Sequence, residues 1–297
     1  MEGTITAKRV VAVLLTAALA FGTMLFATGC SSNSNEGSSN SEPITVVFLP
    51  DSSSADMEAS RDAVAEIIKN ATGRDAEIMT TTDYNVAIEA LVSGKAQVGL
   101  LGAEGYVQAN EKNNAVQAAF TNSDANGTLD EACYYSRICV KTENADQYKD
   151  GDSYSIDNIK GKSFSFVSAT STSGFAIPST AIVEKFGLES SDELLEDGKF
   201  FSSVMFGDSH QGSAVNLLSG NAEAAAFNDV DIAQYVDLVS GEPNAVGSVY
   251  KVKDDAEAPF DSVRGEQFTI LEVTPVLNAP FCYNTDSLTE DEQNAIN

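Results

Sequence analysis

A loop of hydroxyl side chains carries the clearest chemical signal in the chain. Ser168–Ser173 reads SATSTS, follows the apolar stretch Phe164–Val167, and precedes a helical pattern with Pro178 in its first turn and Gly187 as its stop signal. The first N–H groups of a helix lack intrahelical partners and attract anions, and hydroxyls add donors without adding positive charge. The pattern taken alone indicates either an oxyanion site or a solvent-facing Ser/Thr turn.

A second polar segment, Gly207–His210 (GDSH), brings an acid, a hydroxyl and an imidazole together in sequence. Neighbouring side chains diverge and cannot form a catalytic triad, and Gly212 stands one position too far from Ser209 for a nucleophile elbow. The chain has a single histidine and no CxxC spacing, so a metal site is not expected. The sequence therefore predicts no enzyme, no metal and no cofactor.

The elements that must position these residues alternate between strands and helices. Strands are expected at residues 44–49, 77–79 and 97–101, with helices at 57–70 and from an Asp83 cap to Gly94. This order predicts a parallel sheet with helices on its faces. The second part repeats the plan, with strands at 164–167, 200–206 and 222–227, a helix at 178–186 and a helix capped by Ser209.

An internal similarity supports two related halves. Ile88–Leu101 (IEALVSGKAQVGLL) and Ala214–Phe227 (AVNLLSGNAEAAAF) share their Leu, their Ser-Gly and the following strand at a constant offset of 126 residues. Chance similarity between two amphipathic helices that end in glycine is the alternative. We predict an α/β fold of two similar α/β lobes joined by hinge strands, with the ligand cleft between them.

The carboxyl ends of the strands are where such sheets bind ligands. Four loops should therefore surround one cleft, namely residues 50–54, 102–106, 168–173 and 228–229. The hinge strands are expected within residues 134–141 and 269–284. The last segment, SLTEDEQNAIN, has a helix-start signature and then stops, which raises the expectation that a C-terminal helix is missing.

The N-terminus resembles an export signal. Lys8 and Arg9 precede an apolar run over residues 10–27 that ends in Thr-Gly-Cys30. AlaThrGlyCys resembles a bacterial lipobox, with Ala27 where Leu is commonest, so Cys30 is expected to carry lipid. An uncleaved transmembrane anchor is the alternative, and either arrangement places the rest of the chain outside the cytoplasmic membrane.

The predicted organisation follows from this. Residues 1–29 form a lipoprotein signal peptide, and 30–43 a flexible Ser/Asn/Gly tether. Residues 44–134 and about 265–297 form lobe 1, and 135–264 form lobe 2. The net charge is −27, and it becomes −28 without residues 1–29, which hold two basic residues and one acidic residue. This charge argues against nucleic acid as a partner.

Three cysteines remain besides Cys30. Cys133 and Cys139 lie six residues apart in an expected strand, which places them about 20 Å apart. A disulfide needs Cα atoms within about 7 Å, so these two should not pair. Cys139 with Cys282, each in a hydrophobic strand-like segment, is the more plausible bridge.

Four segments resemble, in order, the phosphate/phosphite/phosphonate substrate-binding proteins of ABC transporters, a family of the type II periplasmic-binding-protein superfamily. They read DYNVAIEALVSGKAQVGLLGAEGYVQA, IKGKSFSFVSATSTSGFAIP, GDSHQGSAVNLLSGNAEAAAF and TPVLNAPFCYNTD, and the resemblance spans residues 44–297. It implies two lobes that close on an oxyanion and deliver it to a permease. With the lipobox, it implies a lipoprotein anchored to the outer face of the cytoplasmic membrane.

The resemblance also implies ligand-binding roles. Hydroxyls of the loop and the imidazole would donate to phosphonyl oxygens, phenols would contact the ligand from lobe 1, and an acid would pair with a ligand amine. The residues concerned are Ser171, Thr172 and Ser173, then His210, then Tyr84 and Tyr106, and finally Asp229 or a residue one place off.

Each of these residues also has an ordinary explanation. His210 could be a surface histidine at a helix start, the two tyrosines could be lobe-surface or core aromatics, and Asp229 could cap a helix that carries Ile232 and Tyr235. Asp51 near an anion would be unfavourable unless it points away or accepts a ligand proton. A sulfonate or another organic anion remains open as the solute, as does a ligand-sensing lipoprotein, because the sequence separates these poorly.

Overall fold

The computed structural model describes residues 42–53 and 57–297. The predicted signal peptide, Cys30 and nearly all of the tether lie outside the described residues, so these assignments stay predictions. Within the described ranges, no helix is long and apolar enough to cross a membrane.

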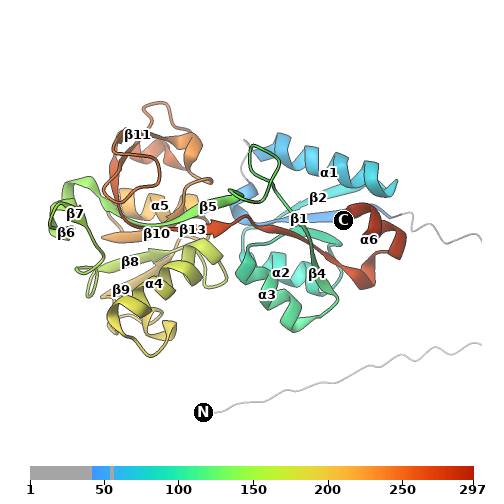
Figure 1. Cartoon of the computed structure of the whole chain (residues 1–297), viewed down its shortest axis with the longest axis horizontal. Helices are drawn as coiled ribbons and strands as arrows, with labels where there is room; N and C mark the ends of the chain where they lie inside the picture. Colours follow the sequence, from blue (N-terminus) through green and yellow to red (C-terminus); the bar gives the residue numbers. More distant parts are fainter. Residues whose placement is uncertain (1–41, 54–56) are drawn as a thin grey trace, which may run out of the picture. The chain divides into compact units, whose positions relative to one another are not determined.

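Lobe 1 is defined here by a five-stranded sheet of order β2-β1-β3-β14-β4 (Figure 1). Its strands are β1 (Ile44–Phe48), β2 (Ala76–Thr80), β3 (Val98–Leu100), β4 (Val116–Thr121) and β14 (Pro280–Asn284). The helices are α1 (Glu58–Thr72), α2 (Tyr84–Val92), α3 (Ala103–Lys112) and α6 (Glu290–Ile296). Alternate residues of β1 point to opposite faces. Val47 packs with α2 and α3, whereas Val46 and Phe48 pack with α1 and α6.

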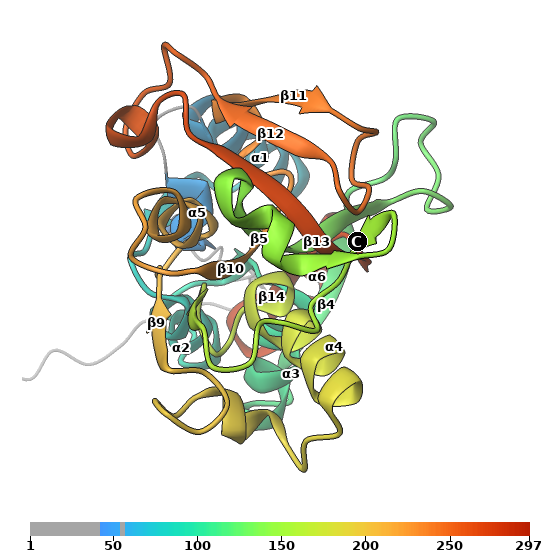
Figure 2. The ribbon, with the colours of Figure 1, turned by 90° about the vertical axis from the view of Figure 1, so that its left-hand side faces the viewer.

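Lobe 2 is defined by a seven-stranded sheet of order β11-β12-β13-β5-β10-β8-β9. Its strands are β5 (Cys133–Lys141), β8 (Ser163–Phe166), β9 (Ser203–Phe206), β10 (Ala224–Asn228), β11 (Val236–Ser240), β12 (Val249–Val252) and β13 (Gln267–Leu277). Figure 2 shows α4 (Ile177–Phe186) and α5 (His210–Leu218) on opposite sides of this sheet. Phe164 and Phe166 pack with Ile182 of α4 on one face, and Phe227 packs with Leu217 of α5 on the other.

Short elements complete the lobes. A small hairpin pairs β6 (Lys149–Asp150) with β7 (Ser153–Tyr154). The helical turns are η1 (Pro50–Ser53), η3 (Thr142–Tyr148), η4 (Thr172–Ala176), η5 (Ser191–Leu194), η6 (Ala233–Tyr235), η7 (Phe260–Val263) and η8 (Thr285–Ser287).

The two sheets share one plan, which confirms the predicted pair of similar α/β lobes. The order β2-β1-β3-β14-β4 matches β9-β8-β10-β5-β13. In each sheet the first three strands are parallel and the fourth is antiparallel to its neighbours. The similar sequence segments occupy equivalent places. Leu91 and Leu217 are fully buried in α2 and α5, and Gly94 and Gly220 adopt positive φ values of 73° and 80° after them.

Two strands carry the chain between the lobes. β5 follows β4 of lobe 1, and β13 leads into β14 of lobe 1. β5 and β13 pair antiparallel, from Cys133 opposite Leu277 to Lys141 opposite Phe268, and both belong to the sheet of lobe 2 (Figure 1). The approximate lobe boundaries given by the sequence stay predictions.

Local signals at helix starts act as predicted. Asp83 accepts hydrogen bonds from Asn85 N and Val86 N at 2.7 and 3.2 Å, and Ser209 Oγ accepts one from Gly212 N at 2.9 Å. The helix predicted from Pro178 begins earlier. The π-helical turn η4 leads directly into α4, and Ser171 is its N-cap, accepting from Gly174 N at 3.1 Å. The hydroxyl loop is therefore itself the start of a helical segment.

The predicted disulfide between Cys139 and Cys282 is wrong, because Cys133, Cys139 and Cys282 are all free. Cys139 lies in β5 of lobe 2 and Cys282 in β14 of lobe 1, so the two belong to different sheets. Cys133 and Cys139 do not pair, as the extended strand predicts.

Candidate functional site

A cavity of about 430 Å³ lies between the lobes. Five of the residues predicted from the sequence line it: Ser171, Thr172, Ser173, His210 and Tyr84. Apolar side chains from both lobes, including Leu49, Leu100 and Val230, form other parts of the wall. None of the described residues that line the cavity is a lysine or an arginine. Any anion bound here must therefore be held by neutral donors.

Thr172 forms a direct contact between the lobes. Its hydroxyl oxygen accepts a hydrogen bond from Glu104 N, in the first turn of α3, at 2.9 Å. A Cβ atom on Gly102 would lie 2.6 Å from the same oxygen, so glycine permits this close approach. Because the Thr172 oxygen is the acceptor in this bond, its own hydrogen remains available to a ligand.

His210 is oriented by the backbone of lobe 2. It is the first residue of α5, and its Nδ1 accepts a hydrogen bond from Asn228 N at 3.0 Å. An imidazole nitrogen that accepts carries no hydrogen, so the hydrogen of neutral His210 is on Nε2. Nε2 lies 3.3 Å from Ser173 Oγ, so it donates to Ser173. The Ser173 hydroxyl hydrogen is then free to donate elsewhere.

The pKa of His210 favours this neutral form. Burial lowers the pKa, and the negative charges of Asp51 and Asp229 oppose that effect without reversing it. The ring is 3% exposed. At neutral pH His210 is therefore an uncharged donor, which agrees with the absence of cationic side chains from the described cavity wall.

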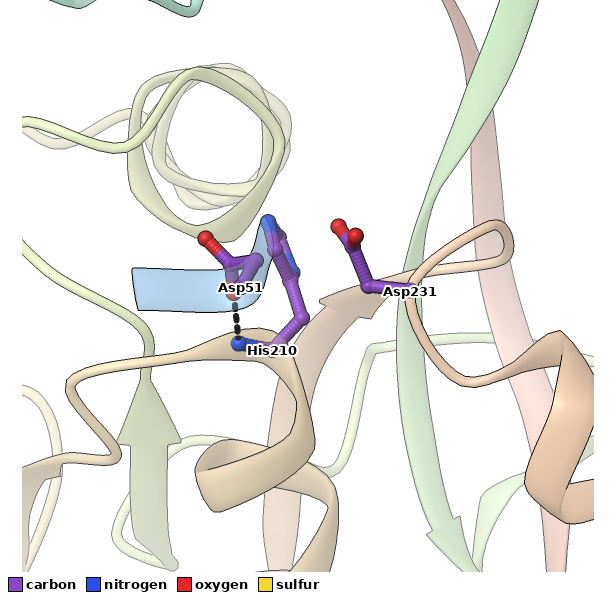
Figure 3. A group of neighbouring side chains, drawn as sticks. All are labelled: Asp51, His210 and Asp231. Atoms are coloured by element: carbon purple, nitrogen blue, oxygen red, sulfur yellow. Dashed lines mark hydrogen bonds between the residues drawn. The ribbon is translucent and has the colours of Figure 1, made fainter. Parts of the chain in front are cut away.

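A carboxyl group that the sequence prediction did not select, that of Asp51, lies at the centre of this interface. Asp51 follows β1 of lobe 1 and is 5% exposed. Its Oδ1 accepts a hydrogen bond from His210 N of lobe 2 at 2.6 Å (Figure 3), and its Oδ2 accepts one from the Tyr84 hydroxyl. Asp51 points into the cleft, so the first of the two alternatives stated for it above, that it points away from an anion, is not met, and the second, that it accepts a ligand proton, stays a prediction.

A second carboxyl group, that of Asp231, faces the same space from the segment after β10. Asn228 Nδ2 donates to its Oδ2 at 2.5 Å, and Asp231 N donates back to Asn228 Oδ1 at 2.9 Å. Burial, and after it the charge of Asp51, raise the pKa of Asp231 to about 8, although the hydrogen bond from Asn228 acts to lower it. Asp231 is therefore largely protonated at neutral pH.

Two tyrosines complete the polar wall. Burial and then the charge of Asp51 hold the pKa of Tyr84 well above its ordinary value. Burial raises the pKa of Tyr134, which was not predicted, to about 12, and a hydrogen bond with Ser173 opposes this. Both phenols therefore stay neutral donors at physiological pH.

Tyr106 and Asp229 lie outside the cavity wall. Tyr106 is half-buried and packs against the core of lobe 1. The carboxylate of Asp229 accepts from Tyr135 N at 2.8 Å and from Asn244 Nδ2 at 3.0 Å. The short turn that follows begins after Ile232 and does not use Asp229 as its cap. The acid that faces the cavity is Asp231, two residues further on.

Asp51, His210 and Asp231 each offer a ligand atom, and these atoms lie within 4.8 Å of one another (Figure 3). The state of His210 decides against a metal ion here. Its Nδ1 already accepts a backbone N–H, so an ion on Nε2 would require the neutral ring to lose its only N–H hydrogen. The arrangement suits a hydrogen-bonded ligand.

Comparison with known proteins places the chain among binding proteins. The model of the family described as "ABC transporter, phosphonate, periplasmic substrate-binding protein" matches residues 46–297. The chain belongs to this family. Members of the family are transporter binding proteins and not enzymes, which agrees with the prediction from the sequence.

The chain also resembles individual proteins whose names or bound ligands concern phosphate or phosphonate. Phosphate-import protein PhnD of Mycolicibacterium smegmatis is 25% identical over 232 residues, which cover 76% of this chain and 69% of that protein. A binding protein component of an ABC phosphonate transporter from Pseudomonas aeruginosa superposes with a TM-score of 0.61 at 15% identity, covering 86% of this chain and 72% of that one. PhnD1 from Prochlorococcus marinus, in complex with methylphosphonate, gives 0.61 at 16% identity over 86% and 83%. These two structures confirm the two-lobed periplasmic-binding-protein fold.

Proposed function

We propose that this protein captures a phosphonate-class oxyanion between its lobes and delivers it to an ABC permease. The observation that carries the proposal is the set of neutral hydroxyl donors that converge on the cavity from Ser171, Thr172 and Ser173, with His210 donating to Ser173 behind them. These donors are oriented by the protein itself, through the N-cap role of Ser171 and the backbone bond to His210. Oriented donors bind an anion with little reorganisation cost.

The geometry of the loop supports the same role. Ser171 is the N-cap of η4 and accepts from Gly174 N, so the other N–H groups of the first helical turn, those of Thr172 and Ser173, lie beside the hydroxyls. Ser173 Oγ accepts the hydrogen of His210, which leaves its own hydrogen for Tyr134 or for a ligand. Thr172 also contacts lobe 1, so a ligand bound to this residue would lie at the contact between the two lobes.

Titration calorimetry with phosphate, phosphite, methylphosphonate, aminoethylphosphonate and sulfonates tests the proposal. At least one phosphorus oxyanion is expected to bind. Ser171→Ala and Thr172→Ala should each weaken that binding by about tenfold or more, since a lost hydrogen bond to a charged group costs on the order of 1.5–3 kcal/mol. Ser202→Ala, at an exposed serine of the same lobe, is the matched control. Unchanged affinity in both loop variants would exclude this site.

The anchor is part of the proposal. Cys30 in its lipobox-like context would attach the protein to the outer face of the cytoplasmic membrane, and residues 31–43 would serve as the spacer. Cys30→Ser is expected to release the protein into the soluble extracytoplasmic fraction when the cells are fractionated. A variant that stays in the membrane fraction after washing would exclude lipidation as the anchor.

A further inference from the structure

Asp229 continues the pairing of β10 with β5, one of the two strands that run between the lobes. The regular ladder ends where Asn228 lies opposite Ser136. One residue further, Asp229 N donates to Tyr135 O at 3.1 Å, and Tyr135 N donates to Asp229 Oδ1 at 2.8 Å. A carboxylate oxygen thus replaces the main-chain carbonyl that a longer strand would supply. The chain can therefore turn into the cavity wall after Asp229 without leaving an N–H of β5 unpaired.

The second oxygen of the Asp229 carboxylate is held by the loop between β11 and β12. Asn244 Nδ2 donates to it at 3.0 Å. The same amide accepts through its Oδ1, from Arg137 Nε at 2.8 Å and from Arg137 Nη2. Asn244 has a φ of 54°, in the left-handed region where asparagine is enriched. One side chain therefore links a carboxylate to a guanidinium, donating on one side and accepting on the other.

Arg137 makes this link a buried one. It belongs to β5, is 3% exposed, and has its Cζ 4.8 Å from the centre of the Tyr250 ring. Its Nη1 has no hydrogen-bond partner among the described residues, and Asn244 Oδ1 and the Tyr250 hydroxyl accept from the rest of the guanidinium. Buried charges are stable only when they are hydrogen-bonded and offset each other. Arg137 and Asp229 do so across Asn244.

The opposite face of β5 contacts the hydroxyl loop. Alternate residues of a strand point to opposite faces, so Tyr134 and Ser136 share the face turned away from Arg137. Ser136 Oγ donates to Ser173 O at 2.7 Å. The Tyr134 phenol, which lines the cavity, is hydrogen-bonded with the Ser173 side chain. The position of Ser173 in the cavity therefore depends on the position of β5.

We propose that Asp229 is a positioning residue for the ligand site, and that it acts through β5 on Tyr134 and Ser173 without touching the ligand. This proposal rests on the proposed function and replaces the role that the family resemblance implied for Asp229. The carboxylate fixes the main chain next to Tyr134, and Asn244 fixes the carboxylate. Without this support β5 and the hydroxyl loop shift together, which weakens the binding of every phosphorus oxyanion by the same factor.

Asp229→Asn tests this role by titration calorimetry with ethylphosphonate and aminomethylphosphonate, two probes of similar size. The carboxylate uses one oxygen for Tyr135 N and the other for Asn244 Nδ2, and an amide has only one oxygen. The variant should bind both probes about tenfold more weakly, the lower end of what loss of an orienting partner costs at metal sites. A loss confined to the amine-bearing probe would overturn the proposal, because it would identify a direct contact with the ligand.

Exchanging the two side chains provides a rescue. In the double variant Asp229→Asn/Asn244→Asp, the new amide accepts from Tyr135 N and donates to the new carboxylate, which also accepts from Arg137. Aspartate tolerates the positive φ of position 244. The exchange should restore both affinities to within about threefold of wild type, whereas two independent changes would add their losses. Affinities that stay at the level of Asp229→Asn in the folded double variant would overturn the proposal.

A double-mutant cycle identifies the residue through which Asp229 acts. Tyr134→Phe should weaken both probes severalfold in the wild-type protein and change the affinities of Asp229→Asn by less than about twofold. The same loss in both proteins would overturn the route through Tyr134.

Two further variants complete the test. Asp237→Asn, at an exposed carboxylate of β11, is the matched control and should change neither affinity. Asn244→Gly suits the positive φ and removes the amide, and it replaces Asp229→Asn should that variant not fold, with the same expected loss. Unchanged affinity for both probes would overturn the positioning role and leave the oxyanion site intact. Absence of binding by the wild-type protein to any phosphonate would instead contradict the proposed function.

Discussion

Replacing Asp231 by asparagine is expected to stabilise the ligand-free protein in alkaline solution and to change little in acid. Burial, followed by the charge of Asp51, raises the pKa of Asp231 from 3.8 to about 8. In the unfolded chain the carboxyl group titrates at its ordinary value. At a pH between these two pKa values, unfolding releases a proton. The Asp231 carboxyl group therefore costs no stability below about pH 4, and its cost in free energy of unfolding grows until the pH passes about 8.

The structure sets the size of the effect. The interval from 3.8 to about 8 spans about four powers of ten in proton affinity, which gives an upper limit of roughly 6 kcal/mol at about 1.4 kcal/mol per tenfold. Asparagine can keep the hydrogen bond from Asn228 through its oxygen, so the change removes mainly the charge. Even about 1.5 kcal/mol would raise the melting temperature by roughly 3–6 °C in a protein of this size.

Thermal unfolding followed by circular dichroism at about pH 4.5, 6.5 and 8.5 measures the effect. The difference between variant and wild type cancels the other titrating groups that the two proteins share. Asp208→Asn, which removes an exposed carboxylate, should show no such growth with pH. If Asp231→Asn raises the melting temperature by the same amount at the lowest and the highest pH, the conclusion that burial and the charge of Asp51 raise the pKa of Asp231 is refuted.

Three further expectations concern the interface, the neighbouring tyrosine and the cysteines. Gly102→Ala places a Cβ atom 2.6 Å from Thr172 Oγ1 and should weaken ligand binding about tenfold or more by holding the lobes apart, since overpacking costs about 1–3 kcal/mol; calorimetry with wild-type-like affinity would contradict this. Tyr106→Phe should leave the dissociation constant within about twofold, because its side chain lies outside the cavity wall; a larger loss would restore Tyr106 to the site. Cys139 and Cys282 should both react with a thiol reagent in denatured, unreduced protein, and an intact mass that shows them blocked until reduction would contradict the free thiols.

The sequence was sufficient for features that depend on local chemistry. The caps Asp83 and Ser209 and the hydroxyl loop all act through residues within a few positions of themselves. The two-lobe plan was also predictable, because it repeats in the sequence and each lobe shows the alternation of strands and helices. These signals can be identified without knowing which residues of the two lobes contact one another.

The remaining features depend on how the lobes meet. Asp51 was noticed as a problem for an anion, but only the contact with α5 shows that it points into the cleft. The stretch Asn228–Asp231 offers two acids, and no local signal tells which faces the cavity. Asp229 accepts hydrogen bonds from Tyr135 N and Asn244, and Asp231 is the acid that faces the cavity. The cysteines were misassigned for the same reason, since hydrophobic strands look alike whichever sheet they join.

The position of β14 governs when the first lobe can finish folding. This strand comes from residues 280–284, yet it lies between β3 and β4 in the middle of the sheet of lobe 1. All strands of lobe 2 precede it in the chain. Because β3 and β4 are not neighbours without β14, the N-terminal segment cannot complete its sheet as it emerges during synthesis or export. Lobe 2 is therefore the unit that can reach its native fold first. Lobe 1, although its first strand comes earlier in the chain, is the last to complete its sheet.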